Sequence, residues 1–371
     1  MVPAAAAPSR RSLLSSTKNR TPVEAAERSE AATSLDQDED GCVQFVRQCL
    51  HGRELSADTI NIICGSWRES TKRQYRGYQQ KWLQFCCEKQ SDPFNADINL
   101  VLDFLTELYK KNLGYSALNT ARSSLSSFLS LSGQSNTKLG DHFLVKRFMK
   151  GVFLSRPTLP KYQFTWDVNK VLGFLKTLSP VQDLSLLDLS KKLAMLFALL
   201  SGQRKQSLHL LDVRNVSVRD DMLIIRYGDL LKQSKPGHHL DEICIAAYPN
   251  DVDLCIVNVY MEYVQRTMKL RGSGSRLFIS TQKPHNSVSV DTIGRWIKGI
   301  MKSAGIDIKC FAPHSTRSAA TSAAANAKLS VDTILRTAGW TSDNTFRKFY
   351  NKPVNLCSDF SNALLDSFHK A

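Results

Sequence analysis

A nearly uninterrupted apolar run, KKLAMLFALL at residues 191–200, places the strongest constraint on how this chain folds. A helix that is apolar around its whole circumference must be surrounded by other elements, so we expect it at the centre of a core. The run stops at Ser201-Gly202, a common type of helix end, and Arg204 follows directly. The sequence therefore predicts a charged side chain held at the end of a rigid, buried helix.

Two prolines within residues 156–160 mark the predicted boundary between two domains. Proline removes a backbone donor and breaks helices, so this stretch is expected to be a linker. The chain has 371 residues, which is enough for two domains with separate cores. We predict a disordered leader at 1–54, a helical domain at 55–156 and a second domain at 160–371. The leader is predicted because its first 40 residues contain almost no aromatic side chains.

The predicted first domain is a compact helical bundle. Tyr75, Tyr78, Trp82 and Phe85 recur at steps of three and four residues, which is typical of one face of a helix. Ser70-Thr71 is the expected cap of that helix. Further helices are predicted to begin near Leu55, Asp97, Ser116 and Lys146, and Gly114 is the expected end of the one that starts at Asp97.

The predicted second domain is mainly helical with a small antiparallel β-sheet. Three short β-branched runs, at 216–218, 222–227 and 242–246, predict three strands, and Asp220-Asp221 predicts a tight turn between the first two. The loop at 230–239 joins the second and third strands and carries two lysines. Helices are predicted at 165–178, 191–200, 255–269 and 290–304.

The charge of the chain favours a polyanionic partner. Lys and Arg number 49 against 34 Asp and Glu, a formal net charge of +15 with a pI near 9.4. The first 54 residues are slightly acidic, so the basic excess lies in the predicted domains. The simplest polyanion is nucleic acid, although a basic protein with solvated lysines has the same composition.

The nine cysteines and the hydropathy pattern bear on location. No C-x-x-C pair and no Cys/His spacing suited to zinc occurs in the sequence, so we expect reduced core thiols in an intracellular protein. We find no secretory pattern at the N-terminus and no apolar run of roughly 20 residues, the length needed to cross a membrane. Cytosol or nucleus is the expected location.

Three residues near the C-terminus form a candidate phosphate-handling set. His314 and Arg317 are three apart, so both can lie on one face of a helix and point at one anion. Arginine offers a planar, permanently charged fork for phosphate oxygens. Tyr350 supplies a hydroxyl that becomes a nucleophile when its proton is removed. Taken singly, His-x-x-Arg is often a structural pair, and Gly339-Trp340 is often a helix cap followed by a core residue.

These residues together carry a resemblance to a known family. Arg204 after a buried helix, a lysine in a hairpin, His314-x-x-Arg317, Gly339-Trp340 and Tyr350 follow the order of the catalytic signature of the tyrosine recombinase (phage integrase) family. The aromatic helix near residue 75 resembles that family's N-terminal core-binding domain, a SAM-like helical fold, so the resemblance covers about residues 60–365. The segments at 202–204, 232–237 and 349–353 look most like recombinases of DIRS-type eukaryotic retrotransposons, for which a nuclear location is expected.

The resemblance implies a reaction and a role for each side chain. Tyr350 would attack a DNA phosphodiester and become linked to the 3′ phosphate, with neither ATP nor a metal required. Arg204 and Arg317 would stabilise the charge on phosphorus. The resemblance implies that His314 would accept the tyrosine proton or bind a phosphate oxygen. Lys232 would protonate the leaving group, with Lys235 as the rival for this role. Trp340 would donate its indole N–H beside the phosphate.

The sequence departs from the family pattern at two places. Ser207 stands where the family usually has an acidic residue three positions after the first arginine, so the orienting partner of Arg204 is missing or comes from elsewhere. The interval from Trp340 to Tyr350 is one residue longer than usual, which a bulge would absorb. Two other functions therefore stay open: a type IB topoisomerase-like nicking and resealing enzyme, and a non-catalytic DNA-binding protein derived from a mobile element.

The end of the chain has an apolar stripe at helical spacing. Its members are Leu356, Phe360, Leu364, Leu365 and Phe368. Such a helix either packs on its own domain or, as the resemblance implies, docks on a neighbouring protomer in a tetramer that holds two DNA duplexes.

Overall fold

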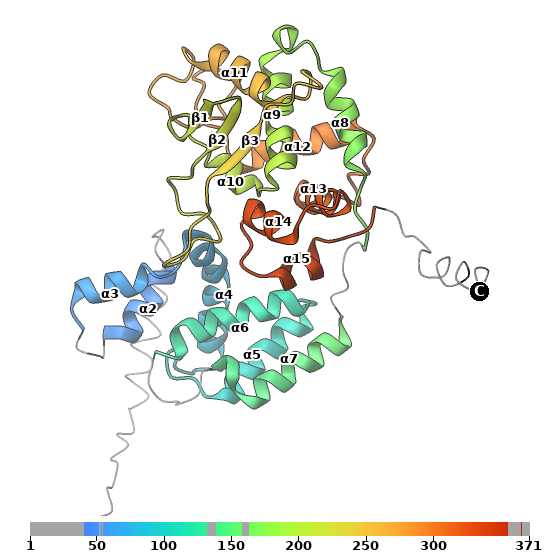
Figure 1. Cartoon of the computed structure of the whole chain (residues 1–371). Helices are drawn as coiled ribbons and strands as arrows, with labels where there is room; N and C mark the ends of the chain where they lie inside the picture. The colour runs from blue at the N-terminus through green and yellow to red at the C-terminus, as the bar shows by residue number, and fades with distance from the viewer. Residues whose placement is uncertain are drawn as a thin grey trace, which may run out of the picture. The chain divides into compact units, whose positions relative to one another are not determined.

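The computed structural model describes residues 41–51, 53, 55–131, 139–157, 163–354 and 365 (Figure 1). The chain divides into two compact units, residues 1–159 and 160–371, and each is described by itself. In the described residues no helix is long and apolar enough to cross a bilayer. Residues 158–162 of the expected linker and all of the C-terminal apolar stripe except the exposed Leu365 lie outside the described residues.

The first unit is a bundle of α-helices around an aromatic core. Trp82 and Phe104 are buried and meet edge to face with ring centroids 5.2 Å apart. The indole N–H of Trp82 donates to the carbonyl of Pro93 at 2.9 Å, which satisfies its one polar atom. The helices are α2 (Gly41–His51), α3 (Ala57–Cys64), α4 (Glu69–Glu88), α5 (Ile98–Lys110), α6 (Tyr115–Leu129) and α7 (Phe143–Ser155), with a short 3-10 turn, η1 (Leu139–Asp141).

Three expectations for this unit need correction. The expected leader ran to residue 54, whereas residues 41–51 form α2, because Phe45, Val46 and Leu50 fill the core of the unit. Residues 1–40 lie outside the described residues. Ser70-Thr71 does not cap α4, which begins at Glu69. Gly114 does not end α5, which stops at Lys110. Gly114 has an extended backbone and directly precedes the first residue of α6.

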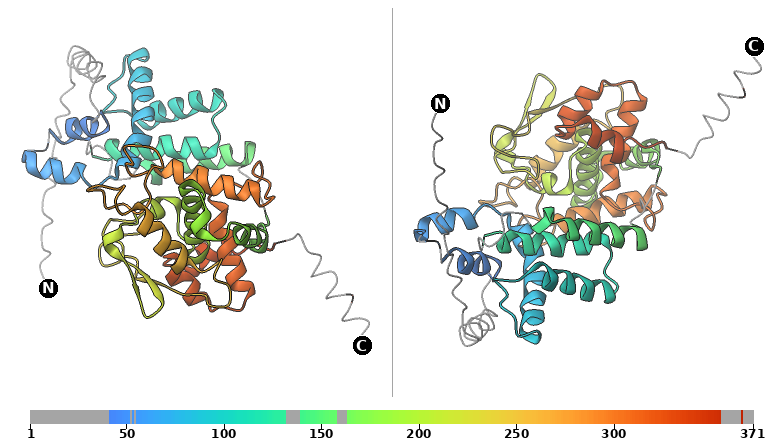
Figure 2. Two further views of the ribbon diagram at one scale, coloured as in Figure 1. Left: turned by 90° about the horizontal axis from the view of Figure 1, so that it is seen from above. Right: turned by 90° about the horizontal axis from the view of Figure 1, so that it is seen from below.

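The second unit is built around α9 (Leu186–Ser201), which extends the apolar run identified in the sequence. All residues from Leu193 to Leu199 are buried, as an apolar circumference requires. Helices α11 (Ile256–Thr267), α12 (Val290–Ser303) and α13 (Ser315–Asn326) contact it from different sides (Figures 1 and 2). The other helices are α8 (Val168–Thr177), α10 (Lys205–His209), α14 (Val331–Ala338) and α15 (Asp343–Phe349), with 3-10 turns η2 (Val181–Asp183) and η3 (Val213–Asn215).

The sheet has three antiparallel strands in the order β1-β2-β3, namely β1 (Val216–Arg219), β2 (Met222–Ile225) and β3 (Ile243–Ala246). Val216 pairs with Ile225, and Leu223 pairs with Ile245. Asp220 and Asp221 both have positive φ, 48° and 55°, the conformation of a two-residue hairpin turn that aspartate tolerates. The prediction of a mainly helical fold with a small antiparallel sheet is confirmed.

A small separate cluster of apolar side chains joins the last helices. Ile334, Ala338, Trp340 and Phe346 form it, and the Tyr350 ring packs against it. Helix α14 ends at Gly339, whose φ of 69° is the left-handed cap conformation predicted for this glycine. The cluster places the end of α15 beside α13 and α14.

Candidate active site

Tyr350 lies at the centre of the site. Its Oη is 3.2 Å from Nε2 of His314, and its ring centroid is 4.5 Å from that of Trp340. The guanidinium of Arg317 lies 5.5 Å from the tyrosine ring. Three of the predicted side chains therefore lie beside a fourth, Tyr350, although His314 and Tyr350 are 36 positions apart in the chain.

The backbone of Tyr350 is fixed by two serines that the sequence analysis did not identify. The hydroxyl groups of Ser318 and Ser322 both donate to the carbonyl of Tyr350, at 2.9 and 2.7 Å. Ser322 also accepts from the backbone N–H of Lys352 at 2.9 Å. Both serines are on α13, four residues apart and thus on one face. Their role could be recognised in the sequence only if the position of Tyr350 relative to this face were known. Helix α13 thereby holds the tyrosine segment beside its own His314 and Arg317.

Tyr350 lies where the chain turns out of its last described helix. Helix α15 stops at Phe349, and Tyr350 takes a non-helical conformation with φ −124° and ψ −27°. The N–H groups of Tyr350 and Asn351 both reach the carbonyl of Phe346, each at 2.9 Å. The second of these bonds spans five residues, a wide turn that occurs at helix C-termini. The chain therefore leaves α15 through a widened turn that starts at Phe346 and closes at Asn351.

Arg317 is a buried charge that bridges two chain segments. Its side chain is 1% exposed; Nη1 donates to the carbonyl of Gly202 at 2.6 Å and Nη2 to that of Ala338 at 2.7 Å. The guanidinium also lies over the Trp340 ring, 4.1 Å from its centroid. Burial lowers the pKa of Arg317 to about 9, assisted by the positive charge of Arg204 and opposed by Tyr350. The group remains cationic at neutral pH.

Arg204 is the cap residue of α10 and is therefore fixed by the end of α9, as predicted. Glycine at 202 takes the left-handed conformation, with φ 59°, which turns the chain out of α9. Nη1 of Arg204 donates to Oε1 of Gln233 at 3.2 Å. Within 163–354 no carboxylate forms an ion pair with Arg204, and Ser207 is a buried, uncharged residue of α10.

The two candidate lysines occupy different parts of the loop between β2 and β3. Lys235 lies at the tip, where its N–H and carbonyl pair with those of His238. The charge of Lys232 is one of those that lower the pKa of His314. Lys232 remains the first choice made from the sequence, with Lys235 as its rival.

The electrostatics of His314 follow from this surrounding charge. Although part of the ring is exposed, its pKa is lowered from the ordinary value, first by desolvation and then by the charges of Arg317, Arg204, Lys232 and Lys205. A lowered pKa keeps the imidazole neutral at pH 7 and able to accept a proton. In the described part of the chain, no three His, Cys, Asp or Glu side chains are grouped so as to hold a metal ion.

A tyrosine hydroxyl, an imidazole and two guanidinium groups in one place are the groups expected of a phosphoryl-transfer site with a tyrosine nucleophile. The comparisons with known proteins agree with that class. The phage integrase family matches residues 167–355, just over half of the chain. No curated protein has a detectably similar sequence. The chain belongs to the phage integrase family, the tyrosine recombinases.

Two solved structures show how far the fold extends beyond that match. The Tn1549 transposon integrase, in complex with transposon right end DNA, superimposes with a TM-score of 0.54 at 17% identity, covering 88% of this chain and 99% of that one. The XerH site-specific recombinase, bound to a palindromic difH substrate, gives a TM-score of 0.56 at 14% identity, covering 93% of each chain. The shared fold therefore includes the helical first unit as well as the unit that carries the site.

Proposed function

We propose that this protein is a site-specific DNA recombinase that cleaves and rejoins duplex DNA with Tyr350 as its nucleophile. The convergence of His314, Arg317 and Trp340 on the Tyr350 side chain carries the proposal. Tyr350 Oη forms a bond to phosphorus, the bond from phosphorus to O5′ breaks, and the 3′ phosphate stays on the tyrosine. Attack by a 5′ hydroxyl reverses these steps and rejoins a strand.

Unpaired donors in the site support a phosphate as its ligand. Arg317 Nε and Trp340 Nε1 are buried and have no hydrogen-bond partner among the described residues. A buried donor without an acceptor costs about 1–3 kcal/mol, and both atoms are donors. A phosphodiester brings acceptor oxygens and negative charge, so it suits both the unpaired donors and the cations at 204 and 317. The indole N–H of Trp340 is assigned to a phosphate oxygen on this basis.

His314 is proposed as the acceptor of the tyrosine proton. Its Nε2 already lies within hydrogen-bond distance of the hydroxyl, and its lowered pKa keeps it neutral. Since the neutral form persists below the ordinary histidine value of about 6.5, we expect cleavage to stay constant as pH falls through 6.5 and to decline only at lower pH.

Replacing His314 with alanine is expected to slow single-turnover cleavage by about 10²-fold and to remove the decline on the acid side. The measurement is the cleavage rate of a nicked duplex between pH 5 and 8. An acid-side decline that is unchanged in His314→Ala would contradict the assignment.

Lys232 is proposed as the acid that protonates O5′ as it leaves. The test uses leaving-group chemistry: a 5′-bridging sulfur leaves as a thiolate and needs no proton. Lys232→Ala is expected to cleave an ordinary phosphodiester about 10²-fold more slowly and to recover on the sulfur substrate. Lys235→Ala is the matched control and should cleave both substrates as the wild type does. Equal defects in the two variants, or no recovery with sulfur, would refute the choice of Lys232.

We further propose duplex DNA as the substrate, a tetramer on two duplexes as the active assembly, and DIRS-type retrotransposon recombinases as the subgroup. DNA is supported by the net charge of +15 and by the two similar recombinases, both solved with DNA. The tetramer rests on the C-terminal apolar stripe, which would dock on a neighbouring protomer. The subgroup, and with it a nuclear location, rests on the segments at 202–204, 232–237 and 349–353.

A covalent capture experiment tests the proposed function. A pool of duplexes with a randomised core carries a nick next to each candidate cleavage position. After cleavage, the short fragment that bears the free 5′ hydroxyl diffuses away, and the covalent intermediate is trapped. We expect adducts that survive denaturant and are linked through the 3′ end of the cleaved strand. Adducts linked through 5′ ends would refute the proposed function. The absence of any adduct, when the protein binds the DNA pool, would refute it as well.

A further inference from the structure

The structure raises the question of what orients Arg204 in a chain that has serine at position 207. The only side chain that receives a hydrogen bond from Arg204 in residues 163–354 is Gln233, at 3.2 Å from Nη1. The contact joins residues 29 apart in sequence, one just before α10 and one on the loop between β2 and β3. It therefore connects Arg204 to the residue next to Lys232.

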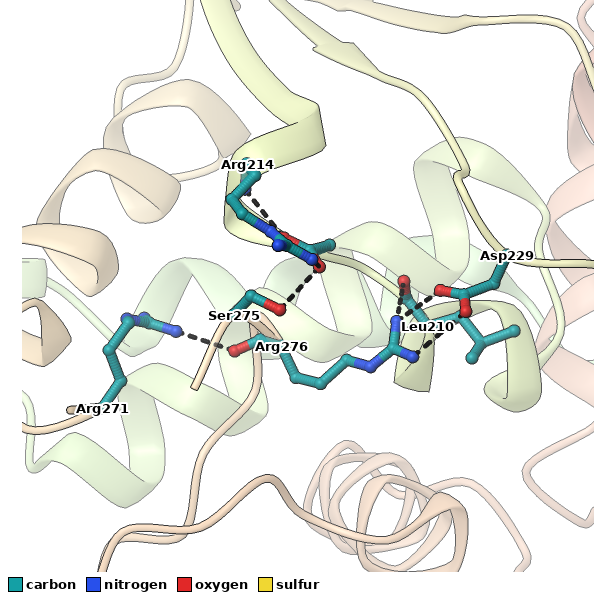
Figure 3. Close-up of polar contacts among 7 residues, drawn as sticks. Leu210, Arg214, Asp229, Arg271, Ser275 and Arg276 are labelled. Carbon is teal, nitrogen blue, oxygen red and sulfur yellow. Dashed lines mark hydrogen bonds and ion pairs between the residues drawn. The ribbon is translucent and has the colours of Figure 1, made fainter. Parts of the chain in front are cut away.

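The loop that carries Gln233 is itself firmly held. Arg276 Nη1 donates to Asp229 at 2.6 Å and to the carbonyl of Leu210 at 3.0 Å, so it ties the start of the loop to the residue that follows α10 (Figure 3). Further along, the Ser234 hydroxyl accepts from the N–H of Leu231 at 3.0 Å and lies 2.8 Å from Nδ1 of His239. Gln233 thus lies between two anchored points.

Gly339 leaves room for the Gln233 amide. A Cβ atom at Gly339 would lie 2.8 Å from Nε2 of Gln233 and 2.9 Å from Cδ1 of Leu240, both closer than real Cβ contacts. The carboxamide is therefore packed against the turn between α14 and Trp340, with Oε1 directed at Arg204. A glutamine so enclosed has little freedom to release the guanidinium.

We propose that Gln233 is the positioning residue of Arg204, in place of the carboxylate that position 207 lacks. This inference rests on the proposed function. Because the amide is neutral, Arg204 keeps its full charge toward the phosphate and toward His314, whose other cationic neighbours are Arg317, Lys232 and Lys205. The same loop that presents Lys232 thereby also fixes Arg204, so the two cations are placed together.

Single-turnover cleavage by Gln233→Ala and Gln233→Glu tests the proposal, with Gln282→Ala, an exposed glutamine outside the site, as the control. Gln233→Ala should cleave on the order of 10²-fold more slowly, the usual consequence of a displaced catalytic group. The defect should persist on the 5′-sulfur substrate, because a misplaced Arg204 is not replaced by a better leaving group. Wild-type cleavage on the same DNA separates failure of this proposal from failure of the proposed function.

Gln233→Glu supplies the readout that a purely structural role would not change. A carboxylate still accepts from Arg204, so cleavage should exceed that of Gln233→Ala. Its negative charge favours the protonated imidazole, so the acid-side decline set by His314 should move to higher pH. Thermal unfolding checks that both variants are folded. The proposal would be overturned if Gln233→Ala cleaved at the wild-type rate or recovered fully on the sulfur substrate. It would also be overturned if the pH profile of Gln233→Glu matched that of the wild type.

Discussion

Replacing Tyr350 with phenylalanine is expected to eliminate covalent attachment to DNA while leaving DNA binding intact. Phenylalanine keeps the ring that packs on Trp340 and lies near Arg317, and it loses only the hydroxyl that is 3.2 Å from His314. Removal of a catalytic nucleophile lowers the rate on the order of 10⁴-fold or more. The measurement is adduct formation on a nicked duplex, with binding followed separately by gel retardation.

Tyr248→Phe is the matched control, because Tyr248 is half exposed and lies two residues after β3, away from the described site contacts. It should form adducts at the wild-type rate. Adducts that persist in Tyr350→Phe would show that another residue attacks the DNA.

Replacing Arg317 with alanine is expected to damage both cleavage and stability. The change removes a cation from the phosphate site, which typically costs about 10²–10³ in rate. It also leaves the buried carbonyls of Gly202 and Ala338 without their donors and opens a cavity beside Trp340. We expect the free energy of unfolding to fall by about 3–5 kcal/mol. Urea unfolding and single-turnover cleavage measure the two effects.

Arg317→Lys separates these contributions. Lysine keeps the charge but lacks the planar fork that reaches two carbonyls at once, so it should regain part of the cleavage rate and little of the stability. Wild-type stability in Arg317→Ala would contradict the bridging role of this side chain.

The meeting of these side chains was predicted from their order along the chain, which resembles the catalytic signature of the family, while local rules predicted where several of them stand. Arg204 follows the glycine that ends α9, Trp340 follows the glycine that ends α14, and His314 and Arg317 share the start of α13. A helix end depends on a few neighbouring residues, such as the glycine that ends α9 or α14, so it can be predicted from the sequence. The fold class was predicted for the same reason, from apolar and β-branched periodicity.

Contacts made by loop residues could not be predicted in this way. The hydrogen bond from Arg204 to Gln233 depends on how the 226–242 loop closes, and the sequence does not determine that register. The hold of Ser318 and Ser322 on the Tyr350 carbonyl depends on the widened end of α15. The burial of Phe45 in α2 likewise depends on distant partners, Phe94 in a turn and Phe128 in α6.

Mass spectrometry of the captured adduct tests the central claim most directly. Protease and nuclease digestion of the trapped protein–DNA complex should release a peptide in which Tyr350 carries a nucleotide through its 3′ phosphate. A nucleotide on any other residue, or attachment through a 5′ phosphate, would contradict the assignment of Tyr350 as the group that breaks the DNA strand.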